Sequence, residues 1–182
     1  ELKIKVLHQW PLSKVEVVEV GGKKFILKTI HKDFVDEVKR QELLRKKCKL
    51  IKIPEIYWIK EGKKVVSFLM EYIPHEPGRI SQKVSLDIIG KFHKDTRDTR
   101  SKFLKKYDFE EFYKDFGNVK QYLNSNLMEK SKKELQDFFR IVFASPISIV
   151  HGDWGNDQLL GKKNRYYVVD FGKSFRGPSI LD

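Results

Sequence analysis

The stretch IVHGDWGNDQLLGKKNRYYVVDFG, at 149–172, constrains the fold of this chain more than any other part of it. Two of its acidic residues each come at the end of an apolar run. Asp153 follows the apolar run 147–150, and Asp170 follows the apolar run 166–169. The intervening GKKN predicts a hairpin turn between two strand segments. We therefore expect the two carboxylates to face the same space.

Two facing carboxylates are what phosphoryl transfer needs. One lies beside the attacking hydroxyl, and the other binds the Mg²⁺ that bridges the nucleotide phosphates. Asp153 fits the first role and Asp170 fits the second. In the kinase catalytic signature, an Asn five positions after the loop Asp holds a second metal ion. Gln158 has that position here, and Asn156 is the second choice for this ligand. The pattern predicts a site that uses ATP and Mg²⁺.

These motifs resemble the aminoglycoside phosphotransferase and choline kinase family. Its catalytic loop has HGD, four variable residues and then usually Asn, followed later by an Asp at the metal site. Gln158 departs from that Asn, although maltokinase-like relatives also carry Gln there. The resemblance implies transfer of the γ-phosphate of ATP to a hydroxyl of a small molecule, with Asp153 as the catalytic residue and Gln158 and Asp170 as metal ligands.

The resemblance also implies a two-lobed α+β fold of the protein-kinase type. The amino-terminal lobe, at 1–73, is expected to be an antiparallel sheet with one helix, and the carboxy-terminal lobe, at 74–182, to be mainly helical. Asp182 matches a structural Asp of the family. The family's acceptor-pocket helices would follow it, and the chain also lacks an initiating Met, so we expect a fragment of a longer protein.

The amino-terminal segment predicts a hairpin of two strands, at 15–20 and 25–28, around a Gly-Gly turn. The resemblance places a phosphate-binding lysine on the second strand, where Lys28 stands in the motif FILK. Strand alternation puts Ile26 and Lys28 on one face. The chain has PLSK instead of a glycine-rich phosphate loop, so we expect Ser13, with Lys14, to take over those contacts.

The segment 33–47 predicts a helix capped by Asp33. Kinase-like lobes place a Glu on this helix to pair with the strand lysine. Glu37 and Glu42 both qualify. We choose Glu42 because it lies fourteen residues after Lys28 and twenty-eight before Met70, which suits the family's spacing better. An ordinary helix-surface ion pair is the alternative for either residue.

The segment MEYIP, at 70–74, resembles the kinase hinge. Adenine is expected to contact the main chain of Glu71 and Ile73 there, and the Pro77-Gly78 pair marks the passage to the second lobe. Helices are predicted at 84–94, 109–127 and 131–144, and His93 on the first of them is expected to be a packed structural residue.

Composition limits the function classes. The formal charge is +12, but Lys and Arg are spread along the chain without a long basic block, so nucleic-acid binding is not expected. No apolar run approaches the ~20 residues that cross a bilayer, and no membrane partner is expected. The single cysteine, Cys48, excludes an internal disulfide, so we predict a cytoplasmic protein with an inert, buried thiol.

Two alternatives stay open. A small atypical protein kinase of the RIO or KEOPS-associated type is favoured by the compactness of the chain. A nucleotide-binding pseudokinase without turnover is favoured by Gln158 and by the missing glycines and acceptor helices. The sequence identifies neither the acceptor nor the oligomeric state.

Overall fold

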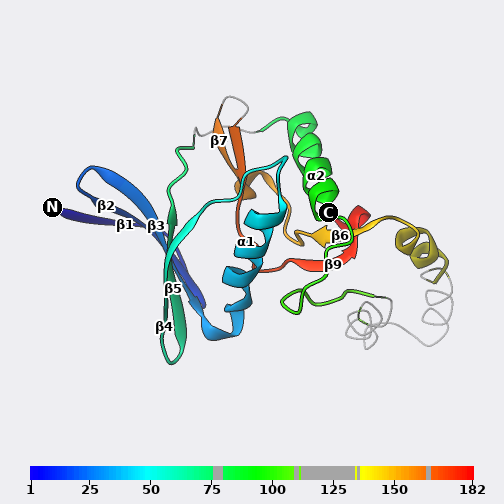
Figure 1. Ribbon diagram of the computed structural model, residues 1–182, viewed down its shortest axis with the longest axis horizontal. Helices are drawn as coiled ribbons and strands as arrows, with labels where there is room; N and C mark the ends of the chain where they lie inside the picture. Colours follow the sequence, from blue (N-terminus) through cyan, green and yellow to red (C-terminus); the bar gives the residue numbers. More distant parts are fainter. Residues whose placement is uncertain (76–79, 109–110, 112–133, 135, 163–164) are drawn as a thin grey trace.

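A computed structural model describes residues 1–75, 80–108, 111, 134, 136–162 and 165–182 (Figure 1). Its amino-terminal part is a five-stranded antiparallel sheet with the strand order β1-β2-β3-β5-β4. The strands are β1 (Leu2–Trp10), β2 (Ser13–Val20), β3 (Lys23–His31), β4 (Ile56–Glu61) and β5 (Val65–Glu71).

The β2–β3 hairpin is confirmed as the sequence predicts it. Gly21 and Gly22 form the turn with φ values of 58° and 76°, a conformation that glycine adopts at little cost. The register pairs Val17 with Ile26 and Val15 with Lys28, so these three apolar residues share one face with the lysine. This face covers the cluster of buried residues beneath the sheet.

One helix, α1 (Asp36–Lys47), follows the sheet strand β3 and a short 3-10 turn, η1 (Lys32–Phe34). The predicted cap at Asp33 is wrong. His31 caps the 3-10 turn instead, because its Nδ1 accepts a hydrogen bond from the Asp33 N–H at 3.4 Å. The buried residues of α1 fall on one helical face, and they are Glu37, Val38, Gln41 and Leu44.

The carboxy-terminal part contains a longer helix and two small two-stranded sheets. Helix α2 (Gln82–Thr96) is capped by Ser81, whose Oγ accepts from the Val84 N–H at 3.4 Å. The sheets pair β6 (Ile147–Val150) with β9 (Phe175–Pro178), and β7 (Leu159–Lys162) with β8 (Arg165–Val168). Two 3-10 turns complete the order, η3 (Asn156–Gln158) and η4 (Ser179–Leu181).

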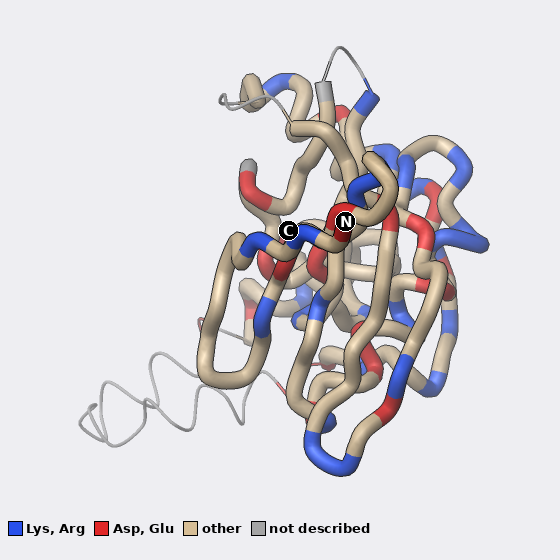
Figure 2. The backbone as a smooth tube through the Cα atoms, turned by 90° about the vertical axis from the view of Figure 1, so that its left-hand side faces the viewer, with Lys and Arg blue, Asp and Glu red and all other residues tan. Residues whose placement is uncertain are grey.

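Of the other predicted helices, the one at 131–144 is helical at its described residues 134 and 136–143. All but residue 111 of the predicted helix 109–127 lies outside the described residues, as does the Pro77-Gly78 pair. Among the residues described, no helix is both long enough and apolar enough to span a bilayer. In the view of Figure 2, the Lys and Arg positions and the Asp and Glu positions are both scattered over the backbone.

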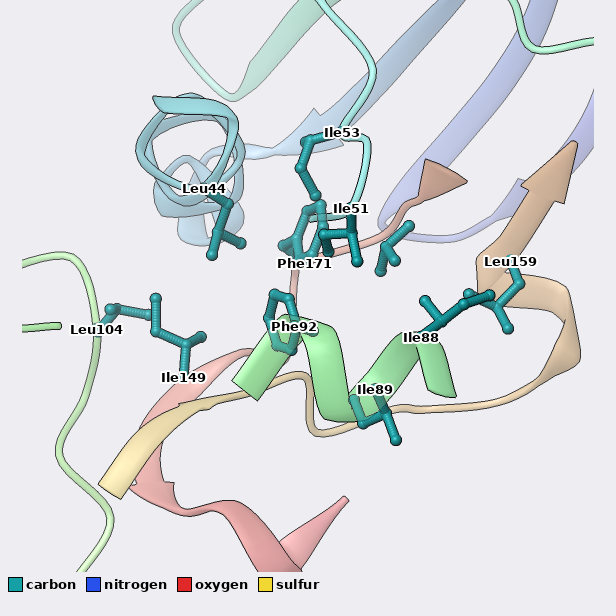
Figure 3. Packing of buried hydrophobic residues seen from close by; sticks show 11 residues of the cluster. Leu44, Ile51, Ile53, Ile88, Ile89, Phe92, Leu104, Ile149, Leu159 and Phe171 are labelled. Carbon is teal, nitrogen blue, oxygen red and sulfur yellow. The ribbon is translucent and has the colours of Figure 1, made fainter. Parts of the chain in front are cut away.

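Two clusters of buried residues make up the core. The first lies under the five-stranded sheet and contains Ile26, Ile30, Val38, Val66, Phe68 and Met70. The second joins α1, α2 and the segment that follows β8, and its members include Leu44, Phe92 and Phe171, which point toward one another in Figure 3. Each of these three side chains is 0% exposed, and burial of such a side chain contributes about 1.5–3 kcal/mol.

Helix α1 contributes to both clusters, with Val38 in the first and Leu44 in the second. Figure 1 shows it between the five-stranded sheet and the β6–β9 pair. The fold is therefore the expected two-lobed α+β fold, in which α1 connects the two cores. The division of the chain at residues 73 and 74 stays a prediction.

Candidate functional site

Lys28 lies at the centre of the candidate site. Alternation along β3 places Ile26, Lys28 and Ile30 on its buried face, and Lys28 is 7% exposed. Its Nζ donates to Glu37 Oε1 at 2.6 Å and to Asp170 Oδ1 at 3.1 Å. A buried ammonium needs such partners, because unpaired burial of a charge is costly. The lysine therefore joins α1 of one lobe to the DFG segment of the other.

The structure corrects the choice of Glu42 as the partner of Lys28. Glu37 makes this ion pair and is 4% exposed, whereas Glu42 lies on the exposed side of α1. Five residues separate Glu37 from Glu42, which is a rotation of about 140° around the helix axis, so the two side chains lie on different faces. Only Glu37 lies on the buried face with Val38 and Gln41. The prediction of Glu42 used spacing along the chain, but the partner of Lys28 is determined by which face of the helix is buried.

Burial and the neighbouring charges leave the pKa values of both Lys28 and Glu37 raised. Burial lowers the pKa of Lys28, but the nearby carboxylates of Glu37 and Asp170 outweigh that effect and leave it raised from its usual 10.5. Burial raises the pKa of Glu37, and the charge of Asp170 adds to this, while Lys28 opposes both. Lys28 is therefore a permanent cation at neutral pH.

Asp153 and Asp170 meet at one cavity, as their positions in the sequence predict. This cavity has a volume of about 180 Å³ and is lined in part by Ser13, Lys28, Glu37, Asp153, Asp170 and Lys173. Asp153 Oδ2 lies 3.0 Å from Lys173 Nζ, and both side chains are well exposed. Sequence reasoning missed Lys173, although it directly follows the DFG triplet.

Asp170 has a φ of 65°, which few residues other than glycine adopt. Residues held in this region are common at ligand sites, where the surrounding structure fixes them. Half of the Asp170 side chain is exposed, so its carboxylate can contact a ligand in the cavity while it also accepts from Lys28. The geometry suits a ligand for a hard cation.

The loop that carries Asp153 is held in place by the buried carboxylate of Asp182. The Asp182 side chain is 1% exposed and accepts from the N–H groups of His151 at 2.7 Å and Gly152 at 2.9 Å. His93 Nε2 lies 3.0 Å from the same carboxylate, which agrees with the structural role predicted for His93. His151 is fully buried and donates from Nε2 to the Val169 carbonyl at 2.9 Å. His151 therefore links the two acidic segments.

Gln158 is 7% exposed, and its amide nitrogen donates to Asp157 Oδ2 at 2.9 Å. Its Oε1 is buried without a hydrogen-bond partner in the described part of the chain. A buried acceptor left unpaired costs about 1–3 kcal/mol, and a cation would satisfy this one. Gln158 is not among the residues that line the cavity with Asp170, so its role as a metal ligand stays a prediction.

The described residues contain no group of three or more His, Cys, Asp or Glu side chains that could hold a metal ion by themselves. Mg²⁺ does not require such a group, because it commonly binds through one or two carboxylates together with substrate phosphates and water. The half-exposed carboxylate of Asp170 fits this donor set.

At the predicted hinge, the Glu71 N–H donates to the Glu55 carbonyl at 2.8 Å. This N–H is not available to a nucleotide, so any main-chain contact from Glu71 would come from its carbonyl. The Glu71 side chain accepts from the Tyr167 hydroxyl at 3.2 Å, which ties β5 to β8. Ile73 is 7% exposed, and its contact with adenine stays a prediction.

A sheet lobe with a buried Lys–Glu ion pair, joined to a second lobe that presents two acids at one cavity, defines the protein-kinase-like fold. Solved structures of small-molecule kinases share it. A thermostable variant of aminoglycoside phosphotransferase APH(4)-Ia, in a ternary complex with AMP-PNP and hygromycin B, superposes with a TM-score of 0.65 at 12% identity and covers 99% of this chain and 70% of its own.

Two further solved structures have the same fold. Amicoumacin kinase hAmiN, in complex with AMP-PNP, Ca²⁺ and Ami, has a TM-score of 0.70 at 12% identity over 97% of this chain and 60% of its own. Spectinomycin phosphotransferase APH(9)-Ia has a TM-score of 0.58 at 12% identity over 98% of this chain and 66% of its own. No protein-family model and no curated protein matches the sequence. At this identity the likeness shows the fold.

Proposed function

We propose that this chain is an ATP-dependent phosphotransferase that moves the γ-phosphate to a hydroxyl group of a small molecule. One observation carries the proposal. Lys28, Asp153 and Asp170 come from three separate parts of the chain and line a single cavity, with Glu37 beneath the lysine. A cation and two carboxylates in this arrangement match the needs of phosphoryl transfer.

Each residue has a separate role in the reaction. Lys28 binds the phosphates of ATP, and Glu37 keeps its ammonium group in place. Asp153 orients the acceptor hydroxyl and takes its proton as the oxygen attacks the γ-phosphorus. The bond between the γ-phosphorus and the bridging oxygen breaks, and ADP leaves with that oxygen. Such a positioned base typically contributes 10²–10⁴-fold to the rate.

Asp170 and Gln158 are the proposed Mg²⁺ ligands. When bound, Mg²⁺ neutralises charge on the phosphate oxygens. Asp170 supports this assignment because it accepts from Lys28 and remains half exposed. Ser13 is the first residue of β2, directly after the turn from β1, and it lines the same cavity, which suits a contact with phosphate. The main chain of Glu71 and Ile73 is the proposed adenine contact.

A small-molecule acceptor is supported by the solved structures that share the fold, which contain hygromycin B, spectinomycin and Ami. This chain spans 60–70% of the length of those three proteins.

A nucleotide-binding module without turnover is the second candidate function. The ion pair between Asp153 and Lys173 favours it, because the carboxylate that would orient the acceptor is already engaged. Both side chains are exposed, and an exposed ion pair contributes only about 0–1 kcal/mol, so a substrate can displace it. This weak pairing leaves transfer as the better supported function.

Transfer of radioactive phosphate from γ-labelled ATP tests the proposal. The acceptors are a panel of hydroxylated small molecules and a generic protein, and the proteins are wild type, Asp153→Asn and Asp170→Asn. Asp87→Asn is the matched control, because its carboxylate pairs with Lys91 on the exposed side of α2, away from the cavity. We expect transfer to fall about 10²-fold or more in the first two variants and to persist in the control.

Each other result has a defined meaning. Binding of Mg·ATP without transfer to any acceptor supports the second candidate function. Transfer to the protein alone supports an atypical protein kinase. Absence of both binding and transfer in wild type contradicts the proposal.

A further inference from the structure

Arg40 extends from α1 to the other lobe, and neither the sequence pattern nor the proposed reaction accounts for it. It lies three residues after Glu37, in a half-buried position. Its Nη1 donates to the Gly172 carbonyl at 2.7 Å and to the Phe171 carbonyl at 3.5 Å. Its Nε donates to the Phe103 carbonyl at 2.7 Å. One side chain thus binds three carbonyls from two separate segments of the second lobe.

The chemistry of the guanidinium group makes these contacts directional. Its N–H donors lie in a rigid plane, so hydrogen bonds at two edges of that plane fix both the position and the tilt of the group. A lysine at this place could direct one ammonium at one carbonyl but could not fix the orientation. Burial lowers the pKa of Arg40, and Asp36 and Glu37 oppose that change. The group remains a cation in any case.

The segment that Arg40 binds is the one that needs support. Asp170 holds a φ of 65°, an unfavourable value for a residue with a side chain. The carbonyls of Phe171 and Gly172 follow it directly. Glu37 also approaches this segment, since a Cβ added to Gly172 would meet Glu37 Oε2 at 3.3 Å. Helix α1 and the DFG segment are therefore in close contact at two points.

We propose that Arg40 is a positioning residue that couples the placement of α1 to the backbone of 170–172, so that the Lys28–Glu37 pair and the Asp170 carboxylate reach their working positions together. The inference rests on the proposed function, because those positions matter when Mg·ATP is bound. Arg40 itself touches no reacting atom in this account. Its effect should therefore appear in metal-dependent binding rather than in nucleotide binding as such.

The test compares ATP affinity with and without Mg²⁺ by titration calorimetry. Arg40→Met removes the donors and keeps most of the length of the side chain, and Arg40→Lys keeps the charge. Lys46→Met is the matched control on the exposed side of the same helix. We expect Mg²⁺ to tighten ATP binding in wild type and in the control. In Arg40→Met the factor by which Mg²⁺ tightens ATP binding should be about tenfold smaller, which is a usual size for coupling between two sites. The affinity for ATP without Mg²⁺ should change far less. Arg40→Lys should recover part of the lost factor.

Amide hydrogen exchange gives a second readout that needs no ligand. In Arg40→Met the amides of Lys173 and Ser174 should exchange faster than in wild type, while those of the control stay unchanged. Should Arg40→Met fail to fold, Arg40→Lys carries both measurements. An Arg40→Met protein with the full Mg²⁺ gain and unchanged exchange overturns this inference alone. A wild-type protein that binds no Mg·ATP overturns the proposed function and the inference with it.

Discussion

Replacing Glu37 with Gln should destabilise the protein, whereas the same replacement at Glu42 should not. Both residues lie on α1 and both replacements remove one negative charge. Glu37 is buried in an ion pair with Lys28, and Glu42 is exposed. The comparison isolates the buried ion pair from the general effect of changing the charge of the helix.

The magnitude follows from the surroundings of Lys28. Removing one partner of a buried pair costs about 3–5 kcal/mol when the other charge is left uncompensated. Here Asp170 remains as a second partner of the Lys28 ammonium at 3.1 Å, so the charge keeps some compensation. That compensation is partial, because the Asp170 side chain is 50% exposed. We therefore expect Glu37→Gln to lower the free energy of unfolding by about 2 kcal/mol, below that range. For a chain of this size the melting temperature falls by about 2–4 °C per kcal/mol.

Urea unfolding followed by circular dichroism measures the difference. Glu37→Gln should show a lower midpoint with an unchanged slope, and Glu42→Gln should stay within about 0.5 kcal/mol of wild type. The reasoning is refuted if the two variants lose equal stability, or if Glu42→Gln loses more. Equal loss would mean that the buried pair contributes nothing beyond the charge of the helix.

Three more predictions concern single side chains. Asp182→Ala removes the acceptor for the His151 and Gly152 N–H groups. We expect the free energy of unfolding to fall by about 3 kcal/mol and the amides of those two residues to exchange faster. Unchanged amide exchange would contradict the anchoring role of Asp182. Burial, with the charge of Asp95, raises the pKa of Cys48 to about 12. A thiol reagent at pH 8 should therefore react with Cys48 only after the protein unfolds, because the thiolate is the reactive form. Rapid reaction of the native protein would contradict this prediction. Burial lowers the pKa of Lys28, but its carboxylate partners leave that pKa raised above 10.5. The stability advantage of wild type over Lys28→Met should therefore be complete below pH 10.5 and decline above it. A series of unfolding curves at increasing pH measures this advantage, and an increase above pH 10.5 would contradict the prediction.

The meeting of Lys28 with Asp153 and Asp170 could be predicted from the resemblance of their motifs to a kinase-like family, and local patterns support the place of each residue. Strand alternation puts Lys28 on the inner face of β3, and two apolar runs with a turn between them bring the acids together. The same local signals predict the β2–β3 hairpin, where two glycines supply the positive φ values of the turn.

The partner of Lys28 was missed for a physical reason. Chain spacing from Lys28 allows both Glu37 and Glu42, because both lie on the same helix. Glu37 precedes Gln41 by four residues and Leu44 by seven, which is the repeat of one helical face, and these residues are buried. Helical facing could have identified Glu37 from the sequence.

Arg40 and Lys173 carry no comparable signal. Arg40 binds backbone carbonyls, which every residue has, so no side-chain pattern points to its partners. Lys173 pairs with Asp153 across two loops, and this pairing depends on how the loops approach in space. Contacts of this kind follow from the tertiary structure.

The central claim is that one triphosphate site is formed by residues from three separate parts of the chain. Paramagnetic broadening by Mn²⁺·ATP tests it most directly, because the bound ion broadens the NMR signals of nearby amides. The account predicts selective broadening of Ser13, Lys28, Asp153 and Asp170, with Mg²⁺·ATP as the diamagnetic reference. Broadening confined to one of these segments, or none in any of them, would contradict it.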